Sequence, residues 1–150
     1  PHSNGYSLVR KVVERSGLAW DAPAPFEAGK TLAEALLAPT RIYAKALKPI
    51  FAAKLAKGAA HITGGGLVEN TPRALPDHLA ADFDWQGWKR PAVFEWLQMV
   101  GGVPEDDMRR TFNLGVGMIL IVAEAQAHGV IAQLNAGGER AFKIGVLKSA

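Results

Sequence analysis

The chain of 150 residues is 49% hydrophobic and 21% charged, which supplies enough apolar side chains for a core and excludes a disordered chain. It contains no cysteine, so disulfides and thiolate metal sites are excluded. The net charge of +3 is uneven: residues 1–60 carry nine Lys and Arg against four Asp and Glu, and residues 61–150 carry eight against ten. A basic solvated face and an affinity for a phosphorylated small molecule both account for this bias.

Helices dominate the predictions for the first sixty residues. Apolar spacing with start and stop signals predicts helices over 3–17, 31–39 and 48–58 and a short strand over 41–44. The first helix has Ser3 or Asn4 as its cap and Gly17 at its C-terminal end. Thr31 and Glu34 have capping-box spacing. The third helix has a proline near its first turn and a glycine just past its end.

Strands and helices alternate in the rest of the chain. The pattern predicts strands over 59–62, 78–85, 117–123 and 141–148, helices over 91–102, 104–112 and 125–138, a short helix after the glycine turn, and a break or a second helix start at Pro72. This alternation predicts one domain of mixed α/β or α+β class with a mixed sheet of about four or five strands.

We expect a cytoplasmic protein. The start, PHSNGYSLVR, has no signal-peptide pattern and no initiator methionine, which indicates a piece of a longer protein. The longest apolar stretch, VGMILIVAEA, is about half the length of a membrane-spanning helix, so no membrane association is expected. No aromatic-rich basic motif occurs, so nucleic acid is not an expected partner.

Common nucleotide and metal motifs are incomplete in this sequence. The GKT at 29–31 looks like the end of a P-loop, but Ala24 stands where that motif needs its first glycine. The glycines at 64–66 do not form a dinucleotide fingerprint, because position 69 is glutamate. The four histidines show no HExxH spacing, so no metal site is expected in this chain.

A strand, a glycine turn and a helix start follow one another in AAHITGGGLVEN, residues 59–70. Glycine inside an element costs about 0.5–1 kcal/mol relative to alanine, so three in a row indicate a special backbone shape or a close approach. Backbone N–H groups at such a turn can bind an anion, although a structural tight turn explains the pattern equally well. His61 ends the strand beside this turn, where a packed core histidine is the alternative to a functional one.

Two other stretches also combine small or polar residues with the start of a helix or a strand. Ser3 and Asn4 precede a helix in HSNGYSLVR, where they either bind an anion or only cap the helix. In FNLGVGM, residues 112–118, Asn113 precedes two glycines at the entry to a buried strand, and a bulge or close backbone packing is the structural alternative.

Together, PHSNGYSLVRKV, HITGGGLVENTPRALP and FNLGVGM, in this order, closely resemble the C-terminal domain of aminoimidazole ribonucleotide synthetase, also called phosphoribosylformylglycinamidine cyclo-ligase. The intervening PAVFEWLQMVGGVPEDDMRR is similar to the same family, so the resemblance covers essentially the whole chain. It implies a three-layer α/β/α domain that is partly ferredoxin-like. Residues 1–150 would be the C-terminal, substrate-side domain, and the family's N-terminal ATP-binding domain would be absent from this chain.

The resemblance implies an ATP-dependent ligase of purine biosynthesis. In this family formylglycinamidine ribonucleotide closes to aminoimidazole ribonucleotide: the formyl amide oxygen is phosphorylated and is then displaced by a nitrogen of the same substrate. ATP and Mg would bind mainly through the N-terminal domain, which also supplies the principal interface of a homodimer. This chain would form one wall of the active-site cleft, so the isolated chain is expected to be inactive.

By the same resemblance, two segments line the cleft. The first is the start of the first helix, with His2, Ser3, Asn4 and Gly5. The second is the glycine turn, near the substrate phosphate or the transferred phosphoryl group, with His61, Thr63, Gly64, Gly65 and Gly66. His61 and His2 are the candidates for charge balance or proton handling. Arg10 and Arg73 are additional candidates for phosphate binding, with a surface salt bridge as the alternative for each.

Two other functions remain open at this point. One is a related ATP-dependent enzyme of the same superfamily, such as a formylglycinamide ribonucleotide amidotransferase or a selenophosphate synthetase. The other is a non-enzymatic module of this fold that binds a phosphorylated metabolite or a partner protein. The pair of HSNGYSLVR and HITGGG favours the cyclo-ligase.

Overall fold

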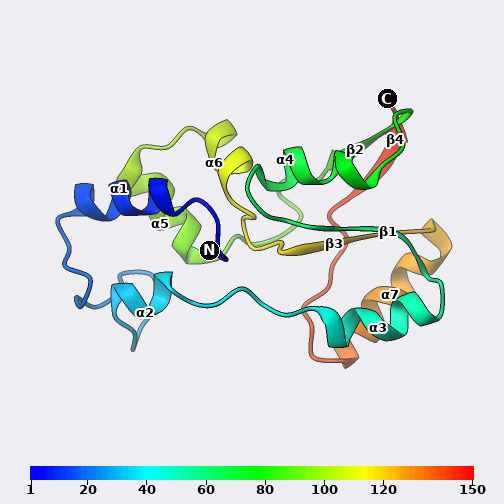
Figure 1. Ribbon diagram of the computed structural model, residues 1–150, viewed down its shortest axis with the longest axis horizontal. Coiled ribbons are helices and arrows are strands. Elements are labelled where there is room, and N and C mark those ends of the chain that lie inside the picture. The colour runs from blue at the N-terminus through cyan, green and yellow to red at the C-terminus, as the bar shows by residue number, and fades with distance from the viewer. The chain divides into compact units, whose positions relative to one another are not determined.

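The computed structural model describes all residues 1–150 and groups them into two compact units (Figure 1). The first unit contains Pro1–Arg41, Ile62–Asn70 and Arg90–Gly117, and the second contains Ile42–His61, Thr71–Lys89 and Met118–Ala150. The units are interleaved in sequence. The glycine-rich segment therefore enters the first unit at Ile62 and leaves it at Asn70.

The first unit is helical. Its helices are α1 (Tyr6–Ser16), α2 (Leu32–Leu36), α4 (Gly66–Asn70), α5 (Ala92–Gly101) and α6 (Glu105–Thr111). Helix α1 packs against α5, and α4 packs against α6. The core side chains include Val9, Val12, Val13, Leu32, Leu36, Leu67, Phe94, Leu97, Met108 and Phe112, all at most 3% exposed. Val9, Val12 and Val13 thus form the buried face of α1.

Two of the predicted helix ends are confirmed and one is wrong. Thr31 and Glu34 form the capping box, with the Glu34 N–H donating to Thr31 Oγ1 at 3.2 Å and the Thr31 N–H donating to Glu34 Oε2 at 2.8 Å. Gly17 ends α1 with a φ of 70°. The N-terminal cap of α1, however, is Gly5 at a φ of 76°, and no side chain caps this helix. Ser3 and Asn4 lie before the capping position, so capping does not explain them.

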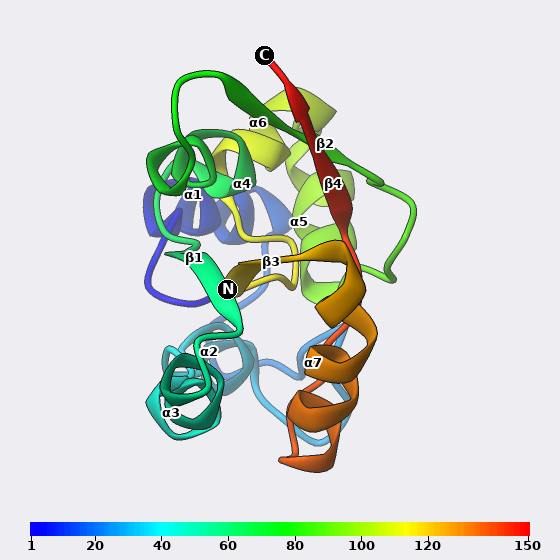
Figure 2. The ribbon, with the colours of Figure 1, turned by 90° about the vertical axis from the view of Figure 1, so that its right-hand side faces the viewer.

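The second unit combines strands with helices. Its elements are α3 (Ala44–Ala52), β1 (Ala56–His61), the short 3₁₀ helix η1 (Pro72–Ala74), β2 (Leu79–Phe83), β3 (Met118–Val122), α7 (Glu124–Ala136) and β4 (Gly145–Ser149). Strand β1 pairs antiparallel with β3, with an irregularity between Ala56 and Gly58. Strand β2 pairs antiparallel with β4, as Figure 2 shows. Pro72 opens η1, which fits the predicted second helix start.

The α+β class is confirmed, but the four strands form two antiparallel pairs rather than one mixed sheet. The continuous apolar run of β3 resembles a strand buried on both faces, which is typical of a parallel sheet. In the structure only Ile119 of this strand is buried, and the other four residues are partly exposed. An apolar run in sequence therefore does not reveal how many neighbours a strand has.

The predictions for residues 41–58 need correction. Residues 41–43 are irregular rather than a strand, and α3 begins at Ala44 and ends at Ala52. Pro49 therefore lies inside the helix instead of in its first turn. The chain leaves the helix at Lys54, which has a left-handed φ of 56°, and β1 starts two residues later. The helix consequently stops six residues before Gly58, which is part of β1. No helix in the structure combines the length and the apolar character needed to cross a membrane.

Candidate active site

The glycine segment begins as an extension of β1 and becomes a tight turn. Ile62 is fully buried, and its N–H donates to the carbonyl of Gly117 at 2.9 Å. The next residues close a turn in which the Gly66 N–H donates to the carbonyl of Thr63 at 3.0 Å. Helix α4 starts at Gly66 and has only five residues. A helix this short contributes little dipole, so any anion affinity of this segment comes from the amides of the turn itself.

The three consecutive glycines have different structural roles. Gly65 has a φ of 95° and Gly66 a φ of 64°, a region that side chains other than glycine's rarely enter. Gly66 is also buried against the carbonyl oxygens of Arg109 and Phe112, where a Cβ would overlap backbone atoms. Gly64 differs from both. Its φ is not positive, and the nearest atom to a Cβ placed there is Asn4 Oδ1 at 3.8 Å. Neither the backbone conformation nor packing requires a glycine at position 64.

The side chain of Asn70, which we did not predict as a site residue from the sequence, hydrogen-bonds to the backbone of the turn. This side chain is 4% exposed, and its Nδ2 donates to the carbonyls of Thr63 (3.2 Å), Gly64 (3.1 Å) and Gly66 (2.8 Å). Its Oδ1 accepts from the Thr63 hydroxyl at 3.2 Å. One side chain therefore binds both ends of the turn. The available sequence signal was an asparagine four residues after the last glycine of the turn, a residue type that hydrogen-bonds nearby backbone groups.

The segment before α1 lies beside this turn. Asn4 Oδ1 is the atom nearest to Gly64 in the direction of a side chain. Ser3 Oγ is 2.8 Å from Thr40 Oγ1, and the Tyr6 hydroxyl donates to the carbonyl of Leu36 at 2.5 Å. These bonds tie the start of the chain to the segment around α2. The structure thus brings together two of the predicted site segments, at Asn4 and Gly64.

The end of α6 supports both segments. Gly5 packs so closely on the ring of Phe112 and on Thr111 that a Cβ would not fit, and Gly66 packs on the carbonyl oxygens of Arg109 and Phe112. Phe112 is 1% exposed. The FNLGVGM stretch starts here. Close packing, the structural alternative for its glycines, is found at Gly115, where a Cβ would lie 2.5 Å from Pro91 Cδ. Its Asn113 accepts from the Gly115 N–H at 2.9 Å and forms a local turn.

A charged cluster fixes the start of α6. Glu105 accepts hydrogen bonds from both Arg90 and Arg109 and from Gln98 Nε2, the last at 3.0 Å. The hydrogen bonds from Arg90 chiefly lower the pKa of Glu105 to about 2, against the opposing effect of burial. A carboxylate held in this way is ionised at neutral pH and is not available as a proton acceptor or metal ligand.

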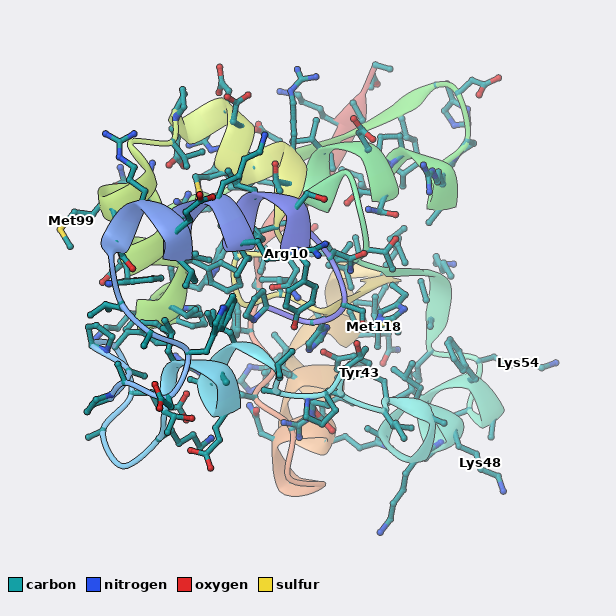
Figure 3. All side chains as sticks on the ribbon, turned by 60° about the vertical axis from the view of Figure 1, so that its left-hand side comes forward. Arg10, Tyr43, Lys48, Lys54, Met99 and Met118 are labelled. Atoms are coloured by element: carbon teal, nitrogen blue, oxygen red, sulfur yellow. The ribbon has the colours of Figure 1, made fainter.

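The remaining predicted residues are His2 and Arg10 in the first unit and His61 and Arg73 in the second. His2 is half-buried in the first unit. Arg10 is exposed on α1, and its Nε donates to the carbonyl of Tyr6 at 3.4 Å, which directs the side chain along the helix (Figure 3). His61 is exposed at the end of β1, opposite Met118, with its ring 6.1 Å from that of Tyr43 in an edge-on arrangement. His61 directly precedes Ile62 in the chain. A packed core histidine is therefore not what the structure contains.

Much of the basic bias of the first sixty residues comes from one stretch in the second unit. Lys45, Lys48, Lys54 and Lys57 are all exposed, and Lys48 and Lys54 project away from the ribbon in Figure 3. Arg73 is exposed in η1. The four lysines fit the interpretation of a solvated basic face. No group of three or more His, Cys, Asp or Glu side chains is placed to hold a metal ion.

The family described as "AIR synthase related protein, C-terminal domain" matches residues 1–150, and the chain belongs to this family. Among curated proteins it is 52% identical, over 147 residues, to the bifunctional purine biosynthetic protein ADE5,7 of Saccharomyces cerevisiae. That match covers 98% of this chain and 18% of the yeast protein, so the chain spans less than a fifth of its relative's length. The resemblance inferred from the three motifs is confirmed at the level of the family.

Proposed function

We propose that this chain is the substrate-side domain of an ATP-dependent ligase that closes formylglycinamidine ribonucleotide to aminoimidazole ribonucleotide in purine biosynthesis. Membership of the family and the 52% identity to a purine biosynthetic protein support the pathway. They favour it over a selenophosphate synthetase or a non-enzymatic module. The activity belongs to the whole protein, and this chain contributes one wall of its active site.

One observation carries the assignment of the site: Asn4 and Gly64 lie next to each other although they are 60 residues apart in the chain. Asn4 does not cap α1, and nothing in the backbone or the packing at position 64 requires glycine. Both anomalies are explained if a phosphate of the ribonucleotide binds between the Asn4 side chain and the amides of the turn. In that arrangement Ser3, Gly5 and Thr63–Gly66 orient the substrate.

We assign His61 its role from its place in the chain, two residues before Thr63, where the turn begins. It is exposed, and in this proposal its imidazole balances charge or moves a proton during the reaction. His2 is a further candidate for proton handling in this proposal. Arg10 and Arg73 are further candidates for phosphate binding.

We assign ATP and Mg to an N-terminal domain of the full-length protein, together with the principal dimer contact. In this chain no group of three or more His, Cys, Asp or Glu side chains is placed to hold a metal ion, and Glu105 is held by two arginines. The residues described here bind and orient the ribonucleotide.

A ring-closure assay on the natural full-length protein tests this proposal with variants at Asn4. The Asn4→Asp variant places a negative charge where the phosphate would bind, so the KM for the ribonucleotide should rise about tenfold or more. Glu14→Gln is a control that changes a charge at an exposed position of α1, the helix that follows Asn4. Absence of ring closure in the wild-type protein would reject the reaction. An unchanged KM in Asn4→Asp would reject the site.

A further inference from the structure

We propose that Asn70 is a positioning residue that presents the N–H groups of Gly64 and Gly65 to the ligand. The inference rests on the proposed function, because the ligand is the phosphate assigned to the turn. Asn70 itself does not touch that ligand. It acts through the turn, by binding the opposite side of its peptide groups.

The first step of the argument is the hydrogen-bond count. An asparagine amide has two N–H donors, and Asn70 Nδ2 lies within 3.2 Å of three carbonyl oxygens, so its two hydrogens are shared among three acceptors. Asn70 is 4% exposed, which means that these carbonyls point toward the protein interior. The Thr63 hydroxyl donates to Asn70 Oδ1 and fixes which way the amide faces.

The second step is the geometry of the peptide bond. The chain contains no cis peptide, and in a trans peptide the C=O and the following N–H point in opposite directions. When the carbonyls of Thr63 and Gly64 face Asn70, the N–H groups of Gly64 and Gly65 must face away from it. Neither of these two N–H groups donates to a backbone carbonyl, whereas the Gly66 N–H donates to Thr63. Two neighbouring amides are therefore turned toward the more exposed side, where Gly64 lies.

The third step concerns what is lost without Asn70. In an Asn70→Ala variant the three carbonyls would lose the donor group that they now share, that of Gly66 in a buried position, which favours rotation of the peptides between Thr63 and Gly65. An Asn70→Asp variant keeps the shape of the side chain but replaces the donor with an acceptor facing three acceptors. Both variants should turn the two N–H groups away from the ligand, although neither changes a ligand contact.

Selective ¹⁵N-glycine labelling of the natural full-length protein, titrated with inorganic phosphate, tests the proposal. In the wild type, phosphate should shift the N–H signals of Gly64 and Gly65 and leave that of Gly66, which is already bonded, nearly unchanged. In Asn70→Ala and Asn70→Asp, the affinity for phosphate should fall about tenfold, roughly the effect of one net hydrogen bond. Thr31→Ala is the matched control, because it removes a helix cap in the same unit without touching the turn.

The outcomes separate this inference from the proposed function. If the wild-type glycines respond and the Asn70 variants bind phosphate as the wild type does, the role of Asn70 is overturned while the phosphate site stands. If Gly66 shifts as much as Gly64 and Gly65, the inferred orientation is wrong, even where the variants fail to fold. If no glycine of the turn responds in the wild type, the phosphate role of the turn is wrong, and the inference on Asn70 fails with it.

Discussion

Alanine substitution at each of the three glycines separates the structural from the functional part of the turn. At Gly66 a Cβ would overlap the carbonyl oxygens of Arg109 and Phe112, and φ is 64°. The left-handed conformation costs a residue other than glycine about 1–2 kcal/mol, and overpacking adds about 1–3 kcal/mol. Gly66→Ala should therefore lower the free energy of unfolding by about 2–5 kcal/mol.

The other two positions differ from each other. At Gly65 the φ of 95° imposes a similar backbone cost, and a Cβ would lie 2.7 Å from Glu69 Cβ, an atom that rotation of the Glu69 side chain does not move. Gly65→Ala should therefore also lose about 2–5 kcal/mol. At Gly64 φ is not positive, and the nearest atom to a Cβ is 3.8 Å away. Gly64→Ala should leave stability unchanged or raise it by about 0.4–1 kcal/mol, because alanine reduces the entropy of the unfolded chain.

The effect on substrate binding should be largest at Gly64, where the effect on stability is smallest. A methyl group at position 64 occupies the space between the turn and Asn4 that we assign to the phosphate, so Gly64→Ala should raise the KM for the ribonucleotide about tenfold without loss of stability. Thermal unfolding and ring-closure kinetics on the full-length protein provide both measurements. A stable Gly64→Ala variant with wild-type kinetics would refute the reasoning, because position 64 would then need glycine for neither structure nor ligand.

Three other predictions follow from the structure and the proposed function. The pKa of Glu105 is about 2 in the folded chain against an ordinary 4.5, so its ionised form stabilises the fold above about pH 4.5, and this contribution is lost as the pH falls toward 2; thermal melts should depend less on pH in Glu105→Gln over this window, and parallel profiles would contradict the role of the cluster. His61→Asn should lower the rate of ring closure about 10²-fold if the imidazole moves a proton; His128→Asn, at another exposed histidine, is the control, and an unchanged rate with a lower melting temperature would indicate a structural role. The 150 residues alone should unfold cooperatively but show no ring closure until the N-terminal domain is added, so activity of the chain alone would contradict the one-wall proposal.

Local signals in the sequence predicted the helices well. The capping box at Thr31 and the left-handed Gly17 depend on residues within a few positions of each other, and the structure confirms both. The strand pairing depends on contacts between residues about 60 positions apart, such as His61 and Met118, and no local pattern specifies it. The prediction of one mixed sheet was wrong for this reason. The predicted end of α3 was wrong because Lys54 adopts a left-handed φ without being glycine, so the sequence contains no visible stop signal there.

The candidate site was predicted in part. The glycine turn and the segment around Asn4 were both identified from their residue types. For the turn a structural tight turn explained the pattern equally well, and for Asn4 helix capping was the favoured explanation. Asn70 was missed because its importance lies in three carbonyls that approach it only in the folded turn. The alternative for Asn4 was helix capping, and it is excluded because Gly5 occupies the capping position.

The end of α6 explains why glycines recur in two segments that are distant in sequence. Gly5 and Gly66 both contact Phe112, one through the ring and the other through the carbonyl oxygen, and neither has room for a Cβ. A single helix end can hold two backbone segments this close only if each has a glycine at the point of contact. The residues next to these contacts, Asn4 and Gly64, are then brought together without contributing to the support themselves. Packing therefore accounts for Gly5 and Gly66, and only Gly64 and Asn4 are left for a ligand to explain.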